Sequence, residues 1–447
     1  MNLHNKKATV IGLGVSNTPL IKYLLDNGAL VTVRDRRTRD ALSEEGKKVI
    51  ASGIEFIGGE DYLADIDADI IFRTPGLRYD CPELVKAQEK GALLTSEMEL
   101  FFELCPCHTI AVTGSDGKTT TTTLIYKMLE KAGKRAFVGG NIGAPLLPKL
   151  SEMKKDDYAV LELSSFQLHT MKKSPEIAVI TNLSPNHLDY HSDMAEYVEA
   201  KTNIFTHQKP GDTLVLNAGN EITASLKNKA VKGVRIIHFN GVDGVYEKDA
   251  AIYYGDERVV EVKDILLPGR HNVENYMAAI GAVYPIVGRE SVAEIAKTFG
   301  GVEHRLELVR VKDGVRFYNS SIDSSPSRTK AALSAFGSEK VIIILGGYDK
   351  KIPYEPLAEP VIKNARCAVL TGATAPKIRK AIEENENYKS SGLELYDVSD
   401  FEEAVKKAAS LAEKGEAVVL SPASASFDKF PNFAVRGNTF RDIVRKL

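Results

Sequence analysis

The sequence predicts an α/β protein built from three domains in series. Short apolar runs alternate with longer amphipathic stretches, which is typical of largely parallel sheets covered by helices on both faces. The 447 residues suffice for roughly two to four domains of ordinary size. Glycine-rich turns follow strand-like segments at residues 12–14 and 114–117. We place the three domains at residues 1–95, 96–301 and 302–447.

The charge balance excludes several kinds of partner. Lys and Arg number 58 and Asp and Glu 60, so no basic excess favours nucleic acid or an anionic membrane. No apolar run approaches the roughly 20 residues of a membrane span. The chain enters a strand-like segment without a charged-then-apolar signal. We therefore expect a cytoplasmic protein, and we take it to be a monomer.

The four cysteines do not predict a disulfide framework, because they are few and scattered for a chain of this length. They are Cys81, Cys105, Cys107 and Cys367. The Cys105-Pro106-Cys107 segment lacks the second Cys/His pair that a zinc site needs. We interpret all four as core or linker residues.

The first domain begins like a nucleotide-binding unit. A strand at residues 8–11 leads into Gly12-Leu13-Gly14, then a helix from Pro19 to about residue 27, and a strand over 30–34 that ends at Asp35. This spacing is typical of a dinucleotide site, in which an acidic residue follows about 20 positions after the glycines. The third glycine position is Asn17, so we favour a pyrophosphate-bearing substrate and keep NAD as an alternative.

The rest of this domain follows the same alternation. Strands are predicted over 54–57, 69–73 and 92–95, with a helix over 81–90. Thr74-Pro75-Gly76 follows the middle one of these strands. Ligands of open parallel sheets bind beyond the carboxyl ends of strands, so we expect this turn to face a ligand.

The second domain begins with the most informative stretch, residues 109–131. A strand at 110–112 runs through a glycine-rich turn into a helix with apolar residues at helical spacing. The turn residues are Gly114, Ser115, Asp116, Gly117, Lys118, Thr119 and Thr120. Backbone N–H groups, the helix N-terminus, a lysine and a hydroxyl would together bind a nucleoside triphosphate and Mg²⁺. Val112 stands where the strict pattern has glycine, and an ordinary turn with a surface lysine is the alternative.

Three further residues of this domain are candidates for metal binding. Glu162 comes late in a predicted strand over 159–163 and would hold Mg²⁺, unless it is a solvent-facing edge residue. His187 and His191 lie in a polar loop after the strand at 178–181, where Pro185 argues against a zinc helix motif and favours one histidine on Mg²⁺ or substrate. Lys201, on a helix predicted over 194–205, is by spacing alone a surface lysine.

The remaining elements complete the alternation. A strand is predicted over 213–216, a loop over 268–272 and a helix over 273–283. In the third domain we predict strands over 315–319, 341–345, 368–371, 393–396 and 417–420, and a helix over 401–413.

With these motifs the chain resembles the Mur ligase family over essentially its whole length. The motifs lie at residues 113–119, 139–143, 162–168, 182–189, 201, 269–275, 304–305 and 420–436. The GGNIG and ELSSFQL forms at 139–143 and 162–168 resemble the D-glutamate-adding branch, and no DNPR-like segment of the diamino-acid-adding relatives is present.

The resemblance implies a fold and a reaction. The fold is a Rossmann-like N-terminal domain for a UDP-substrate, a central P-loop ATPase-like domain, and a Rossmann-like C-terminal domain that binds the amino acid and closes on ATP. The reaction joins D-glutamate to UDP-N-acetylmuramoyl-L-alanine through an acyl phosphate, using ATP and two Mg²⁺ ions, in peptidoglycan precursor synthesis. Related amide ligases of the folylpolyglutamate type, and ATP-hydrolysing switches or motors, are the alternatives.

Roles of individual residues are implied by the same resemblance. Catalysis would rest on Lys118, Glu162, His187 and Lys201, with Thr119, Glu162, His187 and a carbamylated Lys201 at the metals. ATP would meet residues 114–120, Asn275 and Arg305. The remaining substrate contacts would be Val15, Ser16, Asp35, Arg37, Gly76 and Asn141 for the nucleotide sugar, and Lys350, Ser426 and Phe433 for D-glutamate.

One stretch departs from the family pattern of Asp-Ser-Lys-Ala-Thr-Asn. Here residues 320–325 read Ser-Ser-Ile-Asp-Ser-Ser, so Ser320 replaces the aspartate expected near the ATP ribose and Ile322 replaces the lysine. Asp323 lies three residues further on and is a candidate substitute for that aspartate.

Overall fold

The computed structural model describes residues 3–51, 53–188 and 190–447, and the chain divides into two compact units. Unit 1 comprises Met1–Glu261 and Glu274–Ile295, and unit 2 comprises Val262–Val273 and Ala296–Leu447. Residues 1–95 and most of 96–301 thus fall in one unit, and the three-domain boundaries stay a prediction. No helix in the described ranges combines the length and apolarity needed to cross a membrane.

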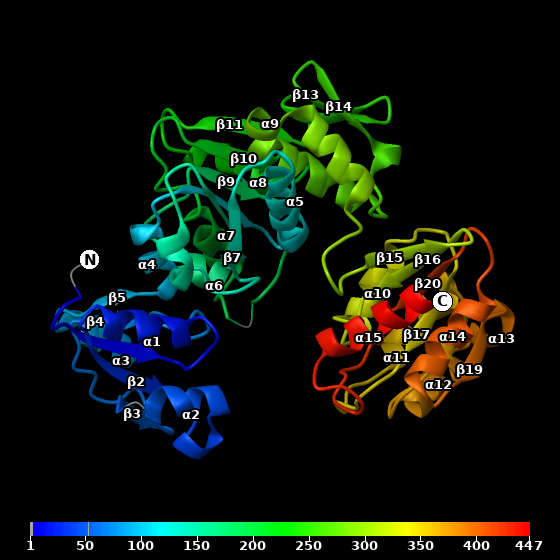
Figure 1. Ribbon diagram of the computed structural model, residues 1–447, viewed down its shortest axis with the longest axis horizontal. Helices are drawn as coiled ribbons and strands as arrows, with labels where there is room; N and C mark the ends of the chain where they lie inside the picture. The colour runs from blue at the N-terminus through cyan, green and yellow to red at the C-terminus, as the bar shows by residue number, and fades with distance from the viewer. Residues whose placement is uncertain (1–2, 52, 189) are drawn as a thin grey trace. The chain divides into compact units, whose positions relative to one another are not determined.

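The first sheet of unit 1 is parallel, with strand order β3-β2-β1-β4-β5. It belongs to the N-terminal part of the chain, drawn in blue in Figure 1. Its strands are β1 (Lys7–Ile11), β2 (Leu30–Asp35), β3 (Glu55–Gly58), β4 (Ile70–Phe72) and β5 (Leu93–Thr95), and its helices are α1 (Asn17–Asp26), α2 (Glu44–Ala51) and α3 (Pro82–Glu89). The central strand β1 is buried because both its neighbours pair with it, Val10 opposite Val33 and Phe72. The strands predicted for residues 1–95 are confirmed.

The second sheet of unit 1 has the order β14-β13-β12-β11-β10-β9-β6-β8-β7. The strands are β6 (His108–Thr113), β7 (Ala136–Gly140), β8 (Tyr158–Glu162), β9 (Ile177–Ile180), β10 (Thr213–Asn217), β11 (Arg235–Phe239), β12 (Val245–Lys248), β13 (Ala251–Tyr254) and β14 (Glu257–Glu261). The helices are α4 (Glu97–Leu104), α5 (Lys118–Lys131), α6 (Ser165–Leu168), α7 (Met194–Thr202), α8 (Glu221–Ser225) and α9 (Arg270–Thr298). The short 3-10 helices of the described residues are η1 (Arg39–Ala41), η2 (Leu147–Glu152) and η3 (Leu226–Lys229) in unit 1, and η4 (Val262–Asp264) in unit 2.

Two predictions for this region need correction. The loop predicted over 268–272 is wrong from Arg270 onward, because α9 already begins there, and the non-helical Gly288 interrupts that helix. The half-exposed strands β7 and β11 were not predicted, because they are short. Nor were the antiparallel strands β12, β13 and β14, since they are short and give no long apolar run. They extend an otherwise parallel sheet, which is common for large sheets.

Unit 2 has one six-stranded sheet in its described residues, with order β15-β16-β20-β17-β18-β19. The strands are β15 (Glu307–Lys312), β16 (Val315–Asn319), β17 (Val341–Leu345), β18 (Ala365–Leu370), β19 (Glu394–Asp397) and β20 (Ala417–Leu420). The helices are α10 (Pro326–Ser334), α11 (Glu355–Asn364), α12 (Ala375–Glu383), α13 (Tyr388–Ser391), α14 (Phe401–Leu411) and α15 (Phe433–Lys446). Strand β15, which was not predicted, is antiparallel and lies at the edge.

Strand β17 shows why this sheet is buried on both faces. Successive side chains of a strand point to opposite faces. Ile343 and Leu345 belong to the apolar cluster on one face, and Ile342 and Ile344 belong to the cluster on the other. The continuous apolar run that predicted the strand is therefore the consequence of helices packed on both sides.

The loops that carry chemistry lie at one edge of each large sheet. In unit 1, β6 pairs in parallel with both β8 and β9, so the segments that follow these three strands emerge together. In unit 2, β20 pairs in parallel with β16 and β17. Ligands of open parallel sheets bind beyond such carboxyl edges.

A glycine substitution tests the packing of the unit 2 edge. Gly346 has φ +114°, and a Cβ there would lie 1.8 Å from the Thr371 carbonyl oxygen. Gly346→Ala should lower the free energy of unfolding of unit 2 by about 3 kcal/mol or more, through backbone strain and overpacking. The measurement is urea unfolding followed by circular dichroism.

Gly392→Ala is the matched control, because Gly392 has φ +70° but nothing within 4 Å of its would-be Cβ. That variant should lose only about 1–2 kcal/mol from backbone strain. Equal losses in the two variants would contradict the packing argument.

Candidate active site

The turn between β6 and α5 requires glycine at two positions. Gly114 has φ +151° and Gly117 has φ +78°. A Cβ at Gly114 would lie 2.0 Å from Thr181 Oγ1, and one at Gly117 would lie 2.2 Å from Asn275 Oδ1. Asn275, which also accepts from Thr121 Oγ1 at 3.3 Å, therefore lies beside the turn.

The loop after β9 supports this turn from one side. The Ser115 and Asp116 N–H groups donate to the Asn182 carbonyl (2.8 Å) and Oδ1 (3.0 Å). The buried Ser115 hydroxyl is 2.9 Å from the Tyr197 hydroxyl and so is engaged inside the protein. Thr119 and Thr120 lie partly exposed in the first turn of α5, whose N-terminal N–H groups and dipole favour an anion.

Two lysines converge on the carbonyl oxygen of Gly114. Lys118 Nζ donates to it at 3.0 Å and to the Ser115 carbonyl at 2.9 Å. Lys201 Nζ donates to the same Gly114 oxygen at 2.9 Å and to Thr113 Oγ1 at 3.1 Å. The structure thus brings together two of the predicted catalytic residues from elements far apart in the sequence.

Lys201 is buried, so the interpretation of it as a surface lysine is wrong. It is 1% exposed at the end of α7. Burial lowers the pKa of its amine well below the usual value, and the nearby Lys118 cation lowers it further, while Glu162 and Asp116 oppose the shift. A neutral amine is the form that such surroundings favour.

Glu162 is also buried, so the alternative of an exposed edge residue is wrong. It is 2% exposed in β8, opposite Val112 in β6 and Gly140 in β7. Its Oε1 accepts from Asn141 Nδ2 at 2.8 Å, and within the described part of the chain its Oε2 has no hydrogen-bond partner. A buried carboxylate oxygen without a donor is suited to a cation.

His187 lies in the exposed part of the loop after β9, with φ +55°. Its ring packs edge-on against Phe166, with ring centroids 4.9 Å apart. Phe166 also contacts the rings of Tyr190 at 4.3 Å and His191 at 5.8 Å. Asp189, the last residue of the motif at 182–189, lies outside the described residues.

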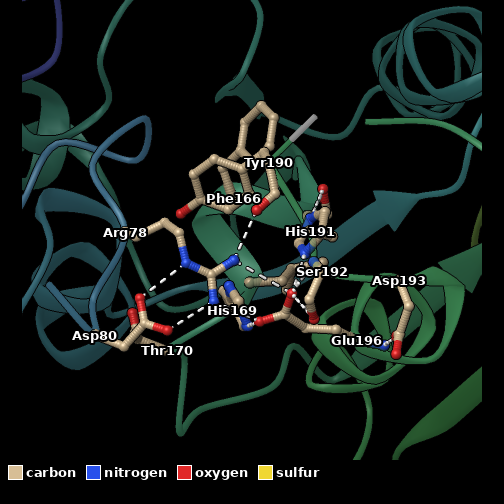
Figure 2. A network of polar contacts seen from close by, with 12 residues as sticks. Arg78, Asp80, Phe166, His169, Thr170, Tyr190, His191, Ser192, Asp193 and Glu196 are labelled. Carbon is tan, nitrogen blue, oxygen red and sulfur yellow. Dashed lines mark hydrogen bonds and ion pairs between the residues drawn. The ribbon is translucent and has the colours of Figure 1, made fainter. Parts of the chain in front are cut away.

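His191 lies in a different candidate group from His187. The group whose ligand atoms lie within 4.8 Å of one another is His169, His191 and Glu196. Arg78 donates to both oxygens of Glu196, at 2.8 and 3.2 Å, and lowers the pKa of that carboxyl to about 2 (Figure 2). The guanidinium therefore already neutralises the carboxylate of this group.

Two arginines that the sequence analysis missed join the first sheet to the site. Arg78 also donates to the Tyr190 carbonyl at 2.6 Å, at the end of the 182–190 loop. Arg73, 1% exposed, donates to the Phe166 carbonyl at 3.2 Å and to Thr170 Oγ1 at 3.2 Å. The sequence signal for Arg73 was its position directly after the apolar strand β4, which predicts burial. An arginine is rarely buried without specific partners, so a buried Arg73 would have indicated a structural contact.

The nucleotide-sugar candidates divide into two groups. Val15, Ser16 and Asn141 line one cavity of about 360 Å³, together with Pro75 and Phe166. The structure therefore brings the first glycine turn of the chain to the carboxyl edge of β7. Phe166, which lines this cavity, also contacts the His187 ring.

Asp35 and Arg37 instead stabilise that glycine turn. Asp35 Oδ2 accepts from the Leu13 N–H at 2.7 Å and from Arg37 at 2.7 Å. Burial raises the pKa of Asp35, but the hydrogen bonds from Arg37 and Leu13 outweigh it and the net pKa is lowered. Gly76 is exposed in the turn that the Leu77 N–H closes onto the Thr74 carbonyl.

Asn17 explains the missing third glycine. Its Nδ2 donates to the Ile11 and Gly12 carbonyls at 3.0 and 2.8 Å and so holds the turn through its side chain. The Asn17 side chain thus stands where the dinucleotide pattern has its third glycine, which in NAD sites allows the helix to pack closely on the strand.

In unit 2 the candidate residues gather at the carboxyl edge of the sheet. Arg305 precedes the antiparallel β15, Lys350 follows β17, Ser426 follows β20, and Phe433 begins α15. Arg305, Lys350 and Phe433 are exposed, whereas Ser426 is buried.

Arg436 holds this edge together and was not singled out from the sequence. It is 2% exposed, and its guanidinium donates to Ser321 Oγ and to the carbonyls of Ser321, Ser424 and Ala425 at 2.9–3.1 Å. Its place at the end of the motif at 420–436 was the only signal.

Comparison with known proteins gives three family matches along the chain. "Mur ligase MurD-like, N-terminal domain" matches residues 6–96, "Mur ligase middle domain" matches 112–283, and "Mur ligase, glutamate ligase domain" matches 304–424. A curated relative from Acetivibrio thermocellus, named UDP-N-acetylmuramoylalanine--D-glutamate ligase, is 50% identical over 100% of this chain and 97% of its own. A relative of the same name from Clostridium botulinum (strain Hall) is 49% identical over 99% and 97%.

Solved structures show the same fold at lower identity. The UDP-N-acetylmuramate-alanine ligase MurC of Thermotoga maritima matches with a TM-score of 0.57 and 21% identity over 99% of this chain and 100% of its own. A pseudomurein peptide ligase type C from Methanothermus fervidus matches with a TM-score of 0.53 and 19% identity over 99% and 100%. With the three family matches and relatives at half identity over the full length, the chain belongs to the Mur ligase family.

Proposed function

We propose that the protein is an ATP-dependent ligase that adds D-glutamate to UDP-N-acetylmuramoyl-L-alanine, in the cytoplasmic synthesis of peptidoglycan precursors. The observation that carries the proposal is the identity of about half, over the whole chain, with relatives named for this product. The geometry of unit 1 supports it, because a phosphate loop, a buried carboxylate and a buried lysine lie at one sheet edge.

The chemistry requires activation of a carboxylate. An oxygen of the substrate carboxylate attacks the γ-phosphorus of ATP. The bond from that phosphorus to the β–γ bridging oxygen breaks, so ADP departs and the substrate becomes an acyl phosphate. The D-glutamate amine then attacks the acyl carbon and loses a proton, while the bond to the phosphate oxygen breaks and phosphate leaves. The protein must hold these groups in line and balance the charge on the transferring phosphoryl group.

The residues of the turn are suited to the triphosphate. The first turn of α5 offers backbone N–H groups and the positive end of the helix dipole. The Lys118 ammonium donates to the Gly114 and Ser115 carbonyls. With ATP bound, it would donate to oxygens of the β- and γ-phosphates instead. Asn275 beside Gly117, and Arg305, would complete the ATP contacts.

The site fits Mg²⁺ in the character of its donors. Glu162 has a buried oxygen without a donor, and Thr119 supplies a hydroxyl in the first turn of α5. These two residues would hold one ion, and His187 with carbamylated Lys201 a second. Mg²⁺ bound there would neutralise charge on the phosphates during transfer.

The environment of Lys201 supports carbamylation. A neutral amine can attack the carbon of CO₂, forming an N–C bond and releasing a proton, whereas an ammonium cannot. Lys201 Nζ donates to a hydroxyl and a carbonyl. Within the described residues, no carboxylate oxygen lies within hydrogen-bond distance of it. The resulting carbamate would be an anion next to Lys118, in surroundings that disfavour an ammonium.

Each unit would take one of the two other substrates. The cavity beside Val15, Ser16 and Asn141 would receive the nucleotide-sugar substrate, with Asp35 and Arg37 stabilising its glycine turn and Gly76 contributing from the separate turn at residues 74–77. Lys350, Ser426 and Phe433 at the edge of unit 2 would hold D-glutamate. We further propose that the enzyme acts as a monomer.

Asp323 is the candidate for the aspartate that Ser320 replaces. It is buried at the carboxyl edge of β16, and its Oδ2 accepts from Ser421 Oγ at 2.8 Å. Burial raises the pKa of Asp323 to about 6, although hydrogen bonds with Ser320 and Ser421 act to lower that pKa. Its oxygens thus face serines of its own unit, so a ribose contact would require it to share these bonds.

The substrate assignment is tested by phosphate release. ATP, Mg²⁺ and UDP-N-acetylmuramoyl-L-alanine are supplied, and amino acids are added one at a time. Release is expected with D-glutamate and not with L-glutamate. Release with L-glutamate alone would overturn the proposal, and release without any amino acid would indicate an ATP-hydrolysing switch or motor.

Lys201→Ala should lower kcat by about a hundredfold or more, since it removes a metal ligand worth several kcal/mol of transition-state stabilisation. Short carboxylates such as formate should restore part of the activity by replacing the lost carbamate oxygens. The measurement is ADP formation at saturating Mg²⁺.

Lys127→Ala, at a partly exposed lysine of helix α5 whose side chain pairs with Glu130, is the control and should keep full activity. Full activity of Lys201→Ala, or a dead variant that carboxylates do not rescue, would contradict carbamylation.

Asp323→Asn should make unit 2 more stable than the wild type at pH 7–8. The folded-state pKa of Asp323, about 6, lies above the ordinary 3.8. The protonated carboxyl therefore contributes fully to the free energy of unfolding below pH 4, and this contribution is lost as the pH rises through 6. The amide keeps the neutral state at all pH values, so the gain should approach about 3 kcal/mol above pH 7 and vanish near pH 4.

Urea unfolding between pH 4 and 8 measures this difference. Asp442→Asn, at an exposed position of α15, should show no such divergence. A gain that does not change with pH would show that the Asp323 carboxyl does not titrate as described.

A further inference from the structure

Two thiols meet in the connection between α4 and β6. The Sγ atoms of Cys105 and Cys107 are 3.4 Å apart. Cys105 follows the last residue of α4, and Cys107 precedes the first residue of β6. The family matches end at residue 96 and resume at residue 112, so this connection lies outside both. Neither thiol takes part in the proposed ligase chemistry.

The backbone explains why the thiols face each other. Cys105 has φ −62° and ψ 119°, an extended conformation, and the ring of Pro106 fixes the next φ. In an extended segment residues i and i+2 point to the same side. A Cys-Pro-Cys sequence therefore presents both sulfur atoms on one side with little freedom to separate.

The two thiols differ in access to solvent. Cys105 is partly exposed, whereas Cys107 is 6% exposed. A hydrogen bond with Cys107 lowers the pKa of the Cys105 thiol, although burial opposes this. The same hydrogen bond, with burial, raises the pKa of Cys107. An accessible thiol of lowered pKa beside a buried one is the arrangement of an attacking and a resolving cysteine.

We propose that Cys105 and Cys107 are a redox-active dithiol that a small-molecule disulfide closes into a reversible intrachain disulfide. The Cys105 thiolate attacks one sulfur of the oxidant, forming a mixed disulfide and releasing one thiolate. The Cys107 thiol, on losing its proton, then attacks Cys105 Sγ, so that the Cys105–Cys107 bond forms and the second thiol of the oxidant leaves. The protein loses two hydrogen atoms, and the oxidant is reduced to two thiols.

The full-length protein allows the site to be read directly. Glutathione disulfide is the probe, and the reaction is stopped in acid and alkylated before digestion. Trypsin places Cys105 and Cys107 in the peptide 91–118, Cys81 in 79–86 and Cys367 in 367–377. The peptide 91–118 should lose the mass of two hydrogens and escape alkylation, and dithiothreitol should restore it. The closed form should exceed the glutathione adduct on this peptide by about tenfold or more, because the second step is intramolecular.

Two variants test the order of attack. Cys107→Ser should retain glutathione on the peptide 91–118, because Cys105 is attacked and nothing resolves the adduct. Cys105→Ser should retain little, because the remaining thiol is buried. Cys81→Ser should leave the closure unchanged.

A wild-type peptide that keeps glutathione without closing would overturn the proposal, as would absence of reaction while the partly exposed Cys81 is modified. Glutathione retained by Cys105→Ser and not by Cys107→Ser would overturn the assigned order.

Discussion

The parallel pairing of β6 with both β8 and β9 is the constraint on which the candidate site depends. It sets Val112 opposite Glu162 on one side and Thr113 opposite Ile180 on the other. The phosphate turn, the buried carboxylate and the polar loop therefore leave the sheet at the same edge. A shift in register by one residue would turn Glu162 to the other face, since side chains alternate along a strand.

Burial of charged groups is a recurring cost, both at the candidate site of unit 1 and, separately, at the sheet edge of unit 2. Arg73 and Arg436 meet it with several hydrogen bonds to carbonyl oxygens, and Glu196 meets it with a guanidinium. Lys201 and Glu162 are different. Lys201 Nζ donates to one hydroxyl and one carbonyl and lies over the Tyr197 ring, and within the described residues Glu162 Oε2 has no donor. Incompletely satisfied buried groups are expensive, so they indicate a site whose partners arrive with its ligands.

Most of the fold could be predicted because its signals are local. Apolar runs such as residues 341–345 predict buried strands directly, and the glycine turns at 12–14 and 114–117 follow from conformations that only glycine adopts readily. The strands β7, β11, β12 to β14 and β15 escaped prediction, because short or half-exposed strands gain their stability from neighbours that the sequence does not show. The start of α9 at Arg270 escaped for a similar reason, since Pro268 and Gly269 suggested a longer loop.

By itself, the sequence determined the α/β class, the phosphate turn and the resemblance to the Mur ligases, because spacing and residue type encode these locally. Only the tertiary structure decided which side chains are buried and what they contact. It turned Lys201 from an apparent surface lysine into a buried amine beside Gly114, and it set Asp35 and Arg37 to hold a turn. It also joined Arg78 to Glu196. Burial and long-range pairing depend on residues tens of positions apart, and no local pattern carries that information.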